Sequence, residues 1–235
     1  MPALSTRAME PELMDDLEIR GPDLEQALNE LDSINCLLGG NYVTLKAIEQ
    51  ILDAASSKSE YHIADLGCGS GDMMRRIRRY LDRRKVHAKL TGFDANPNVI
   101  EFAIAHTPER CRITYNSLNI FSPAFAAHKF DIITATLFFH HFTDAELIVF
   151  FKNLRRQVST AMVINDIHRH WVAFYSIKWL TKLLSRSAMV KHDAPVSVGR
   201  AFTRSELKGI LQQAGFSNYS IRWCWAFRWQ VIAWF

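Results

Sequence analysis

The stretch that decides the fold is Asp65-Leu66-Gly67-Cys68-Gly69-Ser70-Gly71-Asp72-Met73. The apolar run before it, Ile63 and Ala64, predicts a buried strand, and the periodic apolar residues after it predict a helix. Three glycines at alternate positions let a ligand approach the backbone where a Cβ atom would clash. A strand, a glycine turn and a helix N-terminus together predict a site for a nucleotide-type cofactor.

The spacing of the glycines narrows the choice of cofactor. The dinucleotide fingerprint G-x-G-x-x-G requires its third glycine where this chain has Asp72. An acid there suits the helix dipole but repels a pyrophosphate, and no G-K-[ST] follows to make a phosphate-binding loop. We therefore expect a cofactor without phosphates. S-adenosylmethionine (SAM) fits, because it carries a sulfonium cation and an ammonium group.

These residues resemble the first motif of the class I SAM-dependent methyltransferases, of the small-molecule (type 11/12-like) subgroup. The pattern Asp65-x-Gly67-x-Gly69-x-Gly71 matches at every fixed position. The resemblance implies that this segment shapes the methionine pocket and that S-adenosyl-L-homocysteine (SAH) is the product. The cofactor-binding residues expected here are Asp65, Gly67, Cys68, Gly69, Gly71, Asp72 and Met73.

The second motif that resembles the family is Gly92-Phe93-Asp94-Ala95-Asn96-Pro97, at the end of a second predicted strand. The resemblance assigns Asp94, with Ala95 beside it, to the ribose hydroxyls. Asp94 also suits a helix N-cap, because Pro97 is in place for the first helical position. The two roles are compatible.

Two weaker marks complete the cofactor site. Family members often carry an acid that binds the adenine amino group where this chain has Asn119, followed by Ile120. The alternative for Asn119 is an ordinary polar turn. The segment 130–142 resembles the "FD…LHH" segment of small-molecule methyltransferases. Its Thr136 and Leu137 are expected to form the floor of the site where the methyl group is transferred. It lacks the [DNS]-P-P-[YFW] pattern of nucleic-acid base methylases.

Strands and helices alternate from residue 63 to the end, which predicts an α/β fold with a parallel sheet and helices on both faces. The resemblance implies a Rossmann-like, mostly parallel seven-stranded sheet of order 3-2-1-4-5-7-6, whose last two strands form a hairpin. We expect an N-terminal arm and helical cap over 1–56 and the SAM-binding domain over 57–235. The helix predicted over 23–38 has an apparent capping box at Asp23 and Gln26.

An unusually long segment, 166–203, separates the fifth strand from the next helix that packs on the sheet. It is expected to form a helical lid over the cofactor. His168, just past the strand end, is the favoured general base, with His141 as the second catalytic candidate. Both also suit structural roles. The expected acceptor-binding residues are His140, Arg169, Tyr175, His192 and Arg200. The arginines could equally be surface charges.

Metal binding is not expected. Asn165 and Asp166 would suit a divalent ion, but a further carboxylate ligand is not evident. The helix over 170–185 has apolar and basic faces, so it suits either a lid packed on the domain or a peripheral membrane contact.

Composition limits the cellular compartment and the kinds of partner that the protein can have. Four scattered cysteines and the lack of a signal-peptide pattern predict a reduced, cytoplasmic protein. The net charge of +4 is mild, and the basic run around residues 75–85 lacks interleaved aromatics, so nucleic acid is not the expected partner.

The sequence thus predicts methyl transfer from SAM to a hydrophobic, aromatic, polyketide-like or quinone-like small molecule, at oxygen or carbon. The alternatives are a non-catalytic SAM-fold module that binds a partner protein or membrane, and a nicotinamide oxidoreductase. The oligomeric state is left open.

Overall fold

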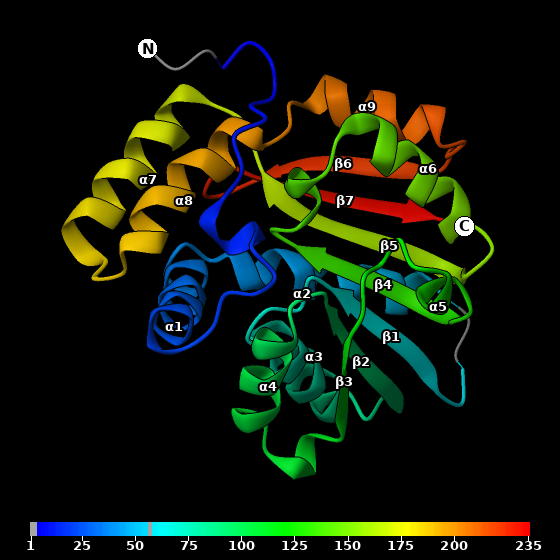
Figure 1. Cartoon of the computed structure of the whole chain (residues 1–235). Coiled ribbons are helices and arrows are strands. Elements are labelled where there is room, and N and C mark those ends of the chain that lie inside the picture. The colour runs from blue at the N-terminus through cyan, green and yellow to red at the C-terminus, as the bar shows by residue number, and fades with distance from the viewer. Residues whose placement is uncertain (1–3, 56–57) are drawn as a thin grey trace.

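The computed structural model describes residues 4–55 and 58–235. Its sheet has seven strands in the order β3-β2-β1-β4-β5-β7-β6, as predicted (Figure 1). The strands are β1 (Tyr61–Leu66), β2 (Ala88–Asp94), β3 (Ile113–Ser117), β4 (Phe130–Thr136), β5 (Val158–Ile167), β6 (Tyr219–Cys224) and β7 (Arg228–Trp234). The first five run parallel, and β7 runs antiparallel to both β5 and β6, so the predicted hairpin is confirmed.

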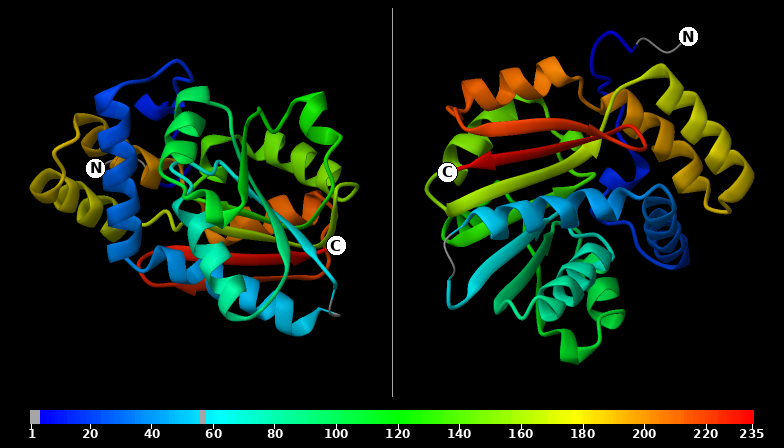
Figure 2. Two further views of the ribbon diagram at one scale, coloured as in Figure 1. Left: turned by 90° about the horizontal axis from the view of Figure 1, so that it is seen from below. Right: turned by 180° about the vertical axis from the view of Figure 1, so that it is seen from behind.

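Helices cover both faces of the sheet, as expected for parallel strands joined by helical crossovers (Figure 2). α2 and α3 pack on one face, and α5, α6 and α9 on the other. The α-helices are α1 (Pro22–Leu37), α2 (Gly40–Ala54), α3 (Asp72–Arg83), α4 (Pro97–Ala105), α5 (Pro123–Ala126), α6 (Asp144–Leu154), α7 (Trp171–Leu184), α8 (Ala188–Arg200) and α9 (Arg204–Gln213). Three short 3-10 helices are η1 (Leu13–Asp15), η2 (Glu109–Cys111) and η3 (Phe139–His141).

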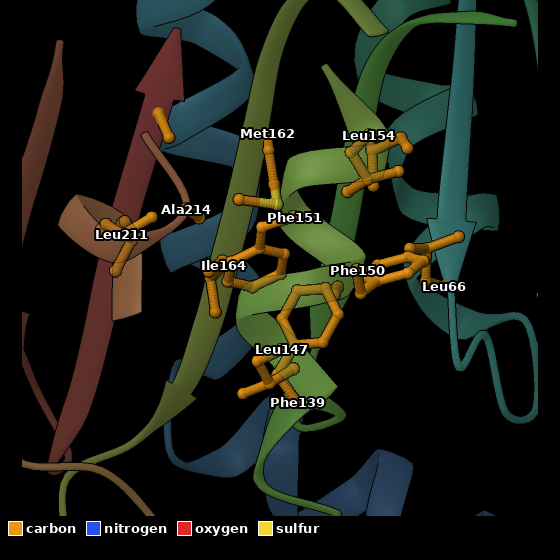
Figure 3. Packing of buried hydrophobic residues seen from close by; sticks show 14 of the residues in the cluster. Leu66, Phe139, Leu147, Phe150, Phe151, Leu154, Met162, Ile164, Leu211 and Ala214 are labelled. Atoms are coloured by element: carbon orange, nitrogen blue, oxygen red, sulfur yellow. The ribbon is translucent and has the colours of Figure 1, made fainter. Parts of the chain in front are cut away.

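The larger core lies under α6. Phe151 of α6 lies beside Met162 and Ile164 of β5, whereas Phe150 points toward Leu66 of β1, and all five side chains are buried (Figure 3). Continuous apolar runs in β4 and β5 reflect burial on both faces of the sheet. This core fixes the strand ends, and thereby the site, in place.

The N-terminal arm docks on the domain through a specific contact. The carboxylate of Asp193 in α8 accepts hydrogen bonds from the backbone N–H groups of Leu13 and Met14, at 2.8 and 3.1 Å. Arg7 donates to the carbonyls of His140 and Phe142 at 2.9 and 2.8 Å. The arm is therefore held against η3, next to the ends of β4 and β5.

Three local predictions are corrected. α1 begins at Pro22 after Gly21, with no side-chain cap, so the predicted capping box at Asp23 is wrong. Asn96, not Asp94, caps α4, since its side chain accepts from the Asn98 N–H. The sequence indicated no helix where α8 forms, because Pro195 interrupts the pattern there.

Two predictions touch residues outside the described part. The expected domain boundary falls between residues 56 and 57, and the segment in which no signal peptide is expected starts with residues 1–3. Within the described residues, no helix has the length and apolar character needed to cross a membrane.

Candidate active site

A cavity of about 470 Å³ lies at the carboxyl ends of β1, β2 and β4. The segments that follow these strands contribute Gly67–Ser70, Asp94–Asn96 and Thr136–Phe138 to its lining. α1 and the N-terminal arm cover it from the other side. Its position is the one where parallel α/β sheets bind ligands, beside the point at which the strand order reverses.

Two glycines of the turn after β1 are required by neighbouring side chains of the protein, and a third leaves space open. Gly67 has φ +62°, and a Cβ atom there would lie 2.1 Å from the Phe138 ring. Gly71 has φ +79°, and its Cβ would lie 2.3 Å from the Tyr115 hydroxyl. Side chains at either position would therefore strain the backbone and clash. A Cβ on Gly69, in contrast, would meet open space, on the cavity side.

Most of the predicted cofactor residues come together around this turn. The cavity lining includes Gly67, Cys68, Gly69, Asp72, Met73, Asp94, Ala95, Asn119, Ile120, Thr136 and Leu137. Asp65 and Gly71 are not in the lining. Asp65 is buried and accepts a 2.6 Å hydrogen bond from the Thr134 hydroxyl, and burial raises its pKa to about 7. Its place is beneath the turn.

Asp94 ends β2 and is held by two backbone donors. Its carboxylate accepts from the N–H groups of Gly69 and Asn96, both at 3.1 Å. Burial raises the pKa of Asp94 above its usual value, although these two hydrogen bonds act to lower it. Each carboxylate oxygen keeps a further lone pair for a donor from a ligand.

Asn119 lies in a turn after β3, where its side-chain oxygen accepts from the Phe121 N–H at 2.8 Å. The turn fixes the amide at the cavity wall, beside the buried Ile120. Thr136 ends β4, and its hydroxyl lies 3.0 Å from that of Thr44 in α2. Leu137 follows with φ +54°, a left-handed conformation that few non-glycine residues adopt.

Acidic side chains outnumber basic ones around the cavity, and the ring of the lining residue His140 lies between the Glu12 and Asp166 carboxylates. Five carboxyl side chains line it, and among the described lining residues there is no lysine or arginine. The carboxyl groups are those of Glu12, Asp15, Asp32, Asp72 and Asp94. Asp72 is partly neutralised by Arg76, at 2.7 Å. Burial and the neighbouring Asp72 charge raise the pKa of Asp32 to about 6, although the Ser70 hydroxyl donates to it at 2.6 Å.

A second group of residues forms the opposite end of the cavity. His141 in η3 donates through Nδ1 to the Asp15 carboxylate at 2.6 Å, and Arg200 donates to the same carboxylate at 2.5 Å. Burial opposes ionisation of Asp15, but these two hydrogen bonds outweigh it and hold its pKa well below the usual value. A donor at Nδ1 leaves the lone pair on Nε2, so His141 can accept a proton there.

His140 differs from His141 although the two rings stack, with centroids 4.4 Å apart. It is buried between two carboxylates: its Nδ1 lies 2.7 Å from Asp166 and its Nε2 lies 3.4 Å from Glu12. Burial lowers the pKa of His140, but the two carboxylates outweigh burial and raise it to about 9. His140 is therefore cationic at neutral pH and holds the arm through Glu12.

Five predicted catalytic or acceptor-binding residues are absent from the cavity lining. His168 packs against the Trp229 ring, with centroids 4.7 Å apart. Arg169 forms a bidentate pair with Glu206, at 2.8 and 2.6 Å. Tyr175 lies on α7 and His192 is hydrogen-bonded to Asp193 at 2.8 Å. Arg200 also lies outside the lining and positions Asp15 instead.

The segment 166–203, expected to form a lid over the cofactor, approaches the cavity through a different helix from the one expected. Of the segment 166–203, the cavity lining includes Ile167 and Ser197, so α8 and not α7 approaches the site. α7 packs against α8. Asn165 and Asp166, the weighed metal ligands, are buried at the end of β5, where Asn165 donates to the Gly40 carbonyl at 2.8 Å.

Sequence reasoning missed Glu12, Asp15 and Asp32. The acidic run at 10–16 was a usable signal for the first two, whereas Asp32 looks like any polar residue on an amphipathic helix. The ligand atoms of Glu12, His140 and His141 lie within 4.8 Å of one another, which satisfies the distance condition for a metal ion. No metal site was expected from the sequence.

Comparison with known proteins finds a family match over part of the chain. A family model described as a methyltransferase domain matches residues 63–160. This part of the chain is similar to a methyltransferase domain, and the sheet order is the one that the class I resemblance implies. The matched range contains the glycine turn, Asp94, Asn119 and both histidines of η3. The arm, α1 and α8 lie outside it. No curated protein matches the sequence.

Solved structures share the fold at low identity. Magnesium protoporphyrin IX methyltransferase from Synechocystis, with bound SAH, is 15% identical, with TM-score 0.55 over 84% of this chain and 83% of that one. The plantazolicin methyltransferase with SAH is 18% identical, with TM-score 0.61 over 90% and 93%. Human N-acetylserotonin methyltransferase with SAM is 15% identical, with TM-score 0.63 over 90% of this chain and 55% of that one.

Proposed function

We propose that the protein transfers the methyl group of SAM to a hydrophobic small molecule, at an aromatic hydroxyl or an activated carbon. The observation that carries this proposal is the charge of the cavity. Its carboxylates face a glycine turn without any lysine or arginine among the described lining residues. Such a site attracts a sulfonium and an ammonium group and repels a diphosphate.

The cofactor would lie across the ends of β1 and β2. Asp94 would accept from the ribose hydroxyls through its remaining lone pairs. Asn119 and Ile120 would contact adenine. Asp32 of α1 and Asp72, the first residue of α3, would receive the ammonium of the methionine moiety. The product would be SAH.

The acceptor would enter the end of the cavity formed by the arm and η3. Apolar side chains from both, including Met14, Leu17 and Phe142, line this end. They favour a hydrophobic acceptor, because its burial removes apolar surface from water. Methyl transfer is an in-line displacement, and much of its rate comes from holding the nucleophile close to and collinear with the reacting carbon.

His141 is the proposed general base. Its Nδ1–H is held by Asp15, so the ring presents the Nε2 lone pair to a proton of the acceptor. This is the arrangement in which a carboxylate fixes the tautomer of a catalytic histidine. His140 is already protonated at neutral pH and is assigned to holding Glu12. His168, the sequence-based candidate, stands outside the cavity lining and is not the proposed base.

A turnover screen tests this function. The purified protein is incubated with methyl-labelled SAM and a panel of phenols, quinols and enolisable ketones, and labelled organic product is counted. We expect turnover with at least one hydrophobic aromatic acceptor, and turnover lower by about a hundredfold or more in a His141→Ala control. SAM binding without any turnover across the panel would favour the non-catalytic module. The absence of SAM binding would refute the proposal as a whole.

A further inference from the structure

Four of the six tryptophans in the chain are exposed to solvent. Burial of tryptophan is the normal outcome of folding, because its large ring contributes much apolar surface. The exposed ones lie in α7 and in the hairpin of β6 and β7. They are Trp171 (62% exposed), Trp179 (58%), Trp223 (48%) and Trp225 (71%). An exposed apolar patch of this kind marks an interaction surface.

The two groups of tryptophans belong to one surface. The His170 ring, at the start of α7, stacks on Phe227 in the β6–β7 turn, with centroids 5.4 Å apart. Phe227 in turn contacts Trp223, with centroids 6.0 Å apart. His170 also stacks on Trp171 at 5.8 Å. The right view of Figure 2 shows this turn beside the start of α7. We call the combined surface the tryptophan face.

α7 is an amphipathic helix, and part of its apolar side faces the solvent. Trp171, Tyr175, Trp179 and Leu183 recur every four residues, so they share one side of the helix. Leu183 is 76% exposed. Ala173 and Thr181 are the buried residues, on the side that packs on the domain. The outward apolar row therefore has no partner within the described chain.

The charges that α7 and the β6–β7 hairpin contribute to this surface are positive, and the Glu30 carboxylate of α1 lies at the end of α7, where it accepts from the Arg186 N–H. Lys178, Lys182 and Arg186 are exposed on or just after α7, and Arg222 is exposed on β6. The sequence has no aspartate or glutamate between Asp166 and Asp193. The Lys182 ammonium lies 5.1 Å from the Trp179 ring centroid, so the basic and aromatic groups are interleaved. An anionic surface would complement this pattern.

We propose that the tryptophan face binds the surface of an anionic phospholipid bilayer. Tryptophan favours the headgroup region, where its ring is buried and its N–H stays hydrated. Lysine side chains reach from the same depth to lipid phosphates. α7 would lie in the plane of the interface, as amphipathic helices of this composition do. A two-fold contact between copies is disfavoured, because it would bring the four basic residues of each copy together.

Vesicle sedimentation tests the proposal without any need for activity, so its failure and that of methyl transfer can be told apart. The protein is mixed with phosphatidylglycerol–phosphatidylcholine vesicles or with phosphatidylcholine alone. We expect binding to the anionic vesicles that weakens with added salt. Trp179→Ser/Leu183→Ser should reduce the partition coefficient at least about tenfold. Lys178→Gln/Lys182→Gln should reduce it about thirtyfold, on the basis of two phosphate-facing charges.

The control pair is Val149→Ser/Lys152→Gln, on exposed positions of α6 outside the face, which should bind as the wild type does. The far-ultraviolet circular dichroism spectrum and the melting temperature report the fold of each variant, independently of SAM binding. No sedimentation of the wild-type protein with anionic vesicles would overturn the proposal. So would equal loss in the α6 control, or a dimer in ultracentrifugation that the Trp179→Ser/Leu183→Ser change dissociates while vesicles are not bound.

Discussion

The two ends of the cavity are built in different ways. Most residues of the cofactor end directly follow β1, β2, β3 and β4, so the sheet fixes them through short connections, and α1 adds Asp32. The acceptor end joins distant segments: Asp15 and His141 are 126 residues apart, and Leu13 and Asp193 are 180 apart. Backbone hydrogen bonds hold the first end, whereas ion pairs and a docked arm hold the second. Changes at the two ends should therefore have separable effects.

The largest effect is expected from His141→Ala. Loss of a general base lowers the rate of the chemical step by about a hundredfold or more, so kcat should fall by that factor. The affinity for SAM should stay the same, because His141 belongs to the acceptor end. Single-turnover rates and calorimetric titration of SAM measure the two quantities separately.

His168→Ala is the matched control for this change. His168 lies outside the cavity lining, so kcat should remain within about threefold of wild type. If kcat instead fell strongly in His168→Ala while His141→Ala stayed active, His168 would be the general base, as predicted from the sequence.

At the cofactor end, Asp94→Ala should weaken SAM binding about ten- to a hundredfold, the range for losing hydrogen bonds to a charged acceptor. The rate at saturating SAM should change much less. Asp94→Asn keeps one of the two acceptor oxygens and places an NH2 group opposite the other backbone donor, so it should have an intermediate effect. Unchanged affinity in Asp94→Ala, with an unchanged melting curve, would refute the ribose assignment.

The same division explains what could be predicted from the sequence. The alternation of strands and helices, the final hairpin and the glycine turn depend on local patterns, and the structure confirms them. The sheet order, also confirmed, came from the family resemblance, and the cofactor role of Asp94 stays a prediction. The acceptor end depends on which distant side chains meet. His168 follows its strand as closely as a catalytic residue would, yet its ring turns to Trp229. Glu12 and Asp15 acquire a role because Asp193 docks the arm.

A smaller effect is expected from pH at the cofactor end. Burial raises the pKa of Asp32 to about 6, so its carboxyl group becomes charged as the pH rises through 6. If the charged form holds the ammonium of SAM, affinity should increase by up to about tenfold between pH 5 and pH 7. Asp32→Asn should remove most of this dependence. A wild-type affinity that is flat over this range would exclude Asp32 from the ammonium site.

The smallest effect concerns stability at the acceptor end. The pKa of His140 is raised to about 9 from 6.5 in the unfolded chain. Its ion pairs therefore stabilise the fold fully below pH 6.5, and this contribution is lost as the pH rises through 9. The melting temperature should fall by about 3 °C or more over that window. His87→Gln, at an exposed histidine far from the arm, should follow the wild-type curve, whereas His140→Gln should flatten it.

The central claim is that the acidic cavity accepts a cationic sulfur nucleoside and rejects diphosphates. Calorimetric titration of the wild-type protein with SAM, SAH and NADH under one buffer tests it directly. We predict saturable binding of SAM and SAH at a 1:1 ratio and no binding of NADH. Saturable binding of NADH, or none of the three ligands binding, would contradict the account.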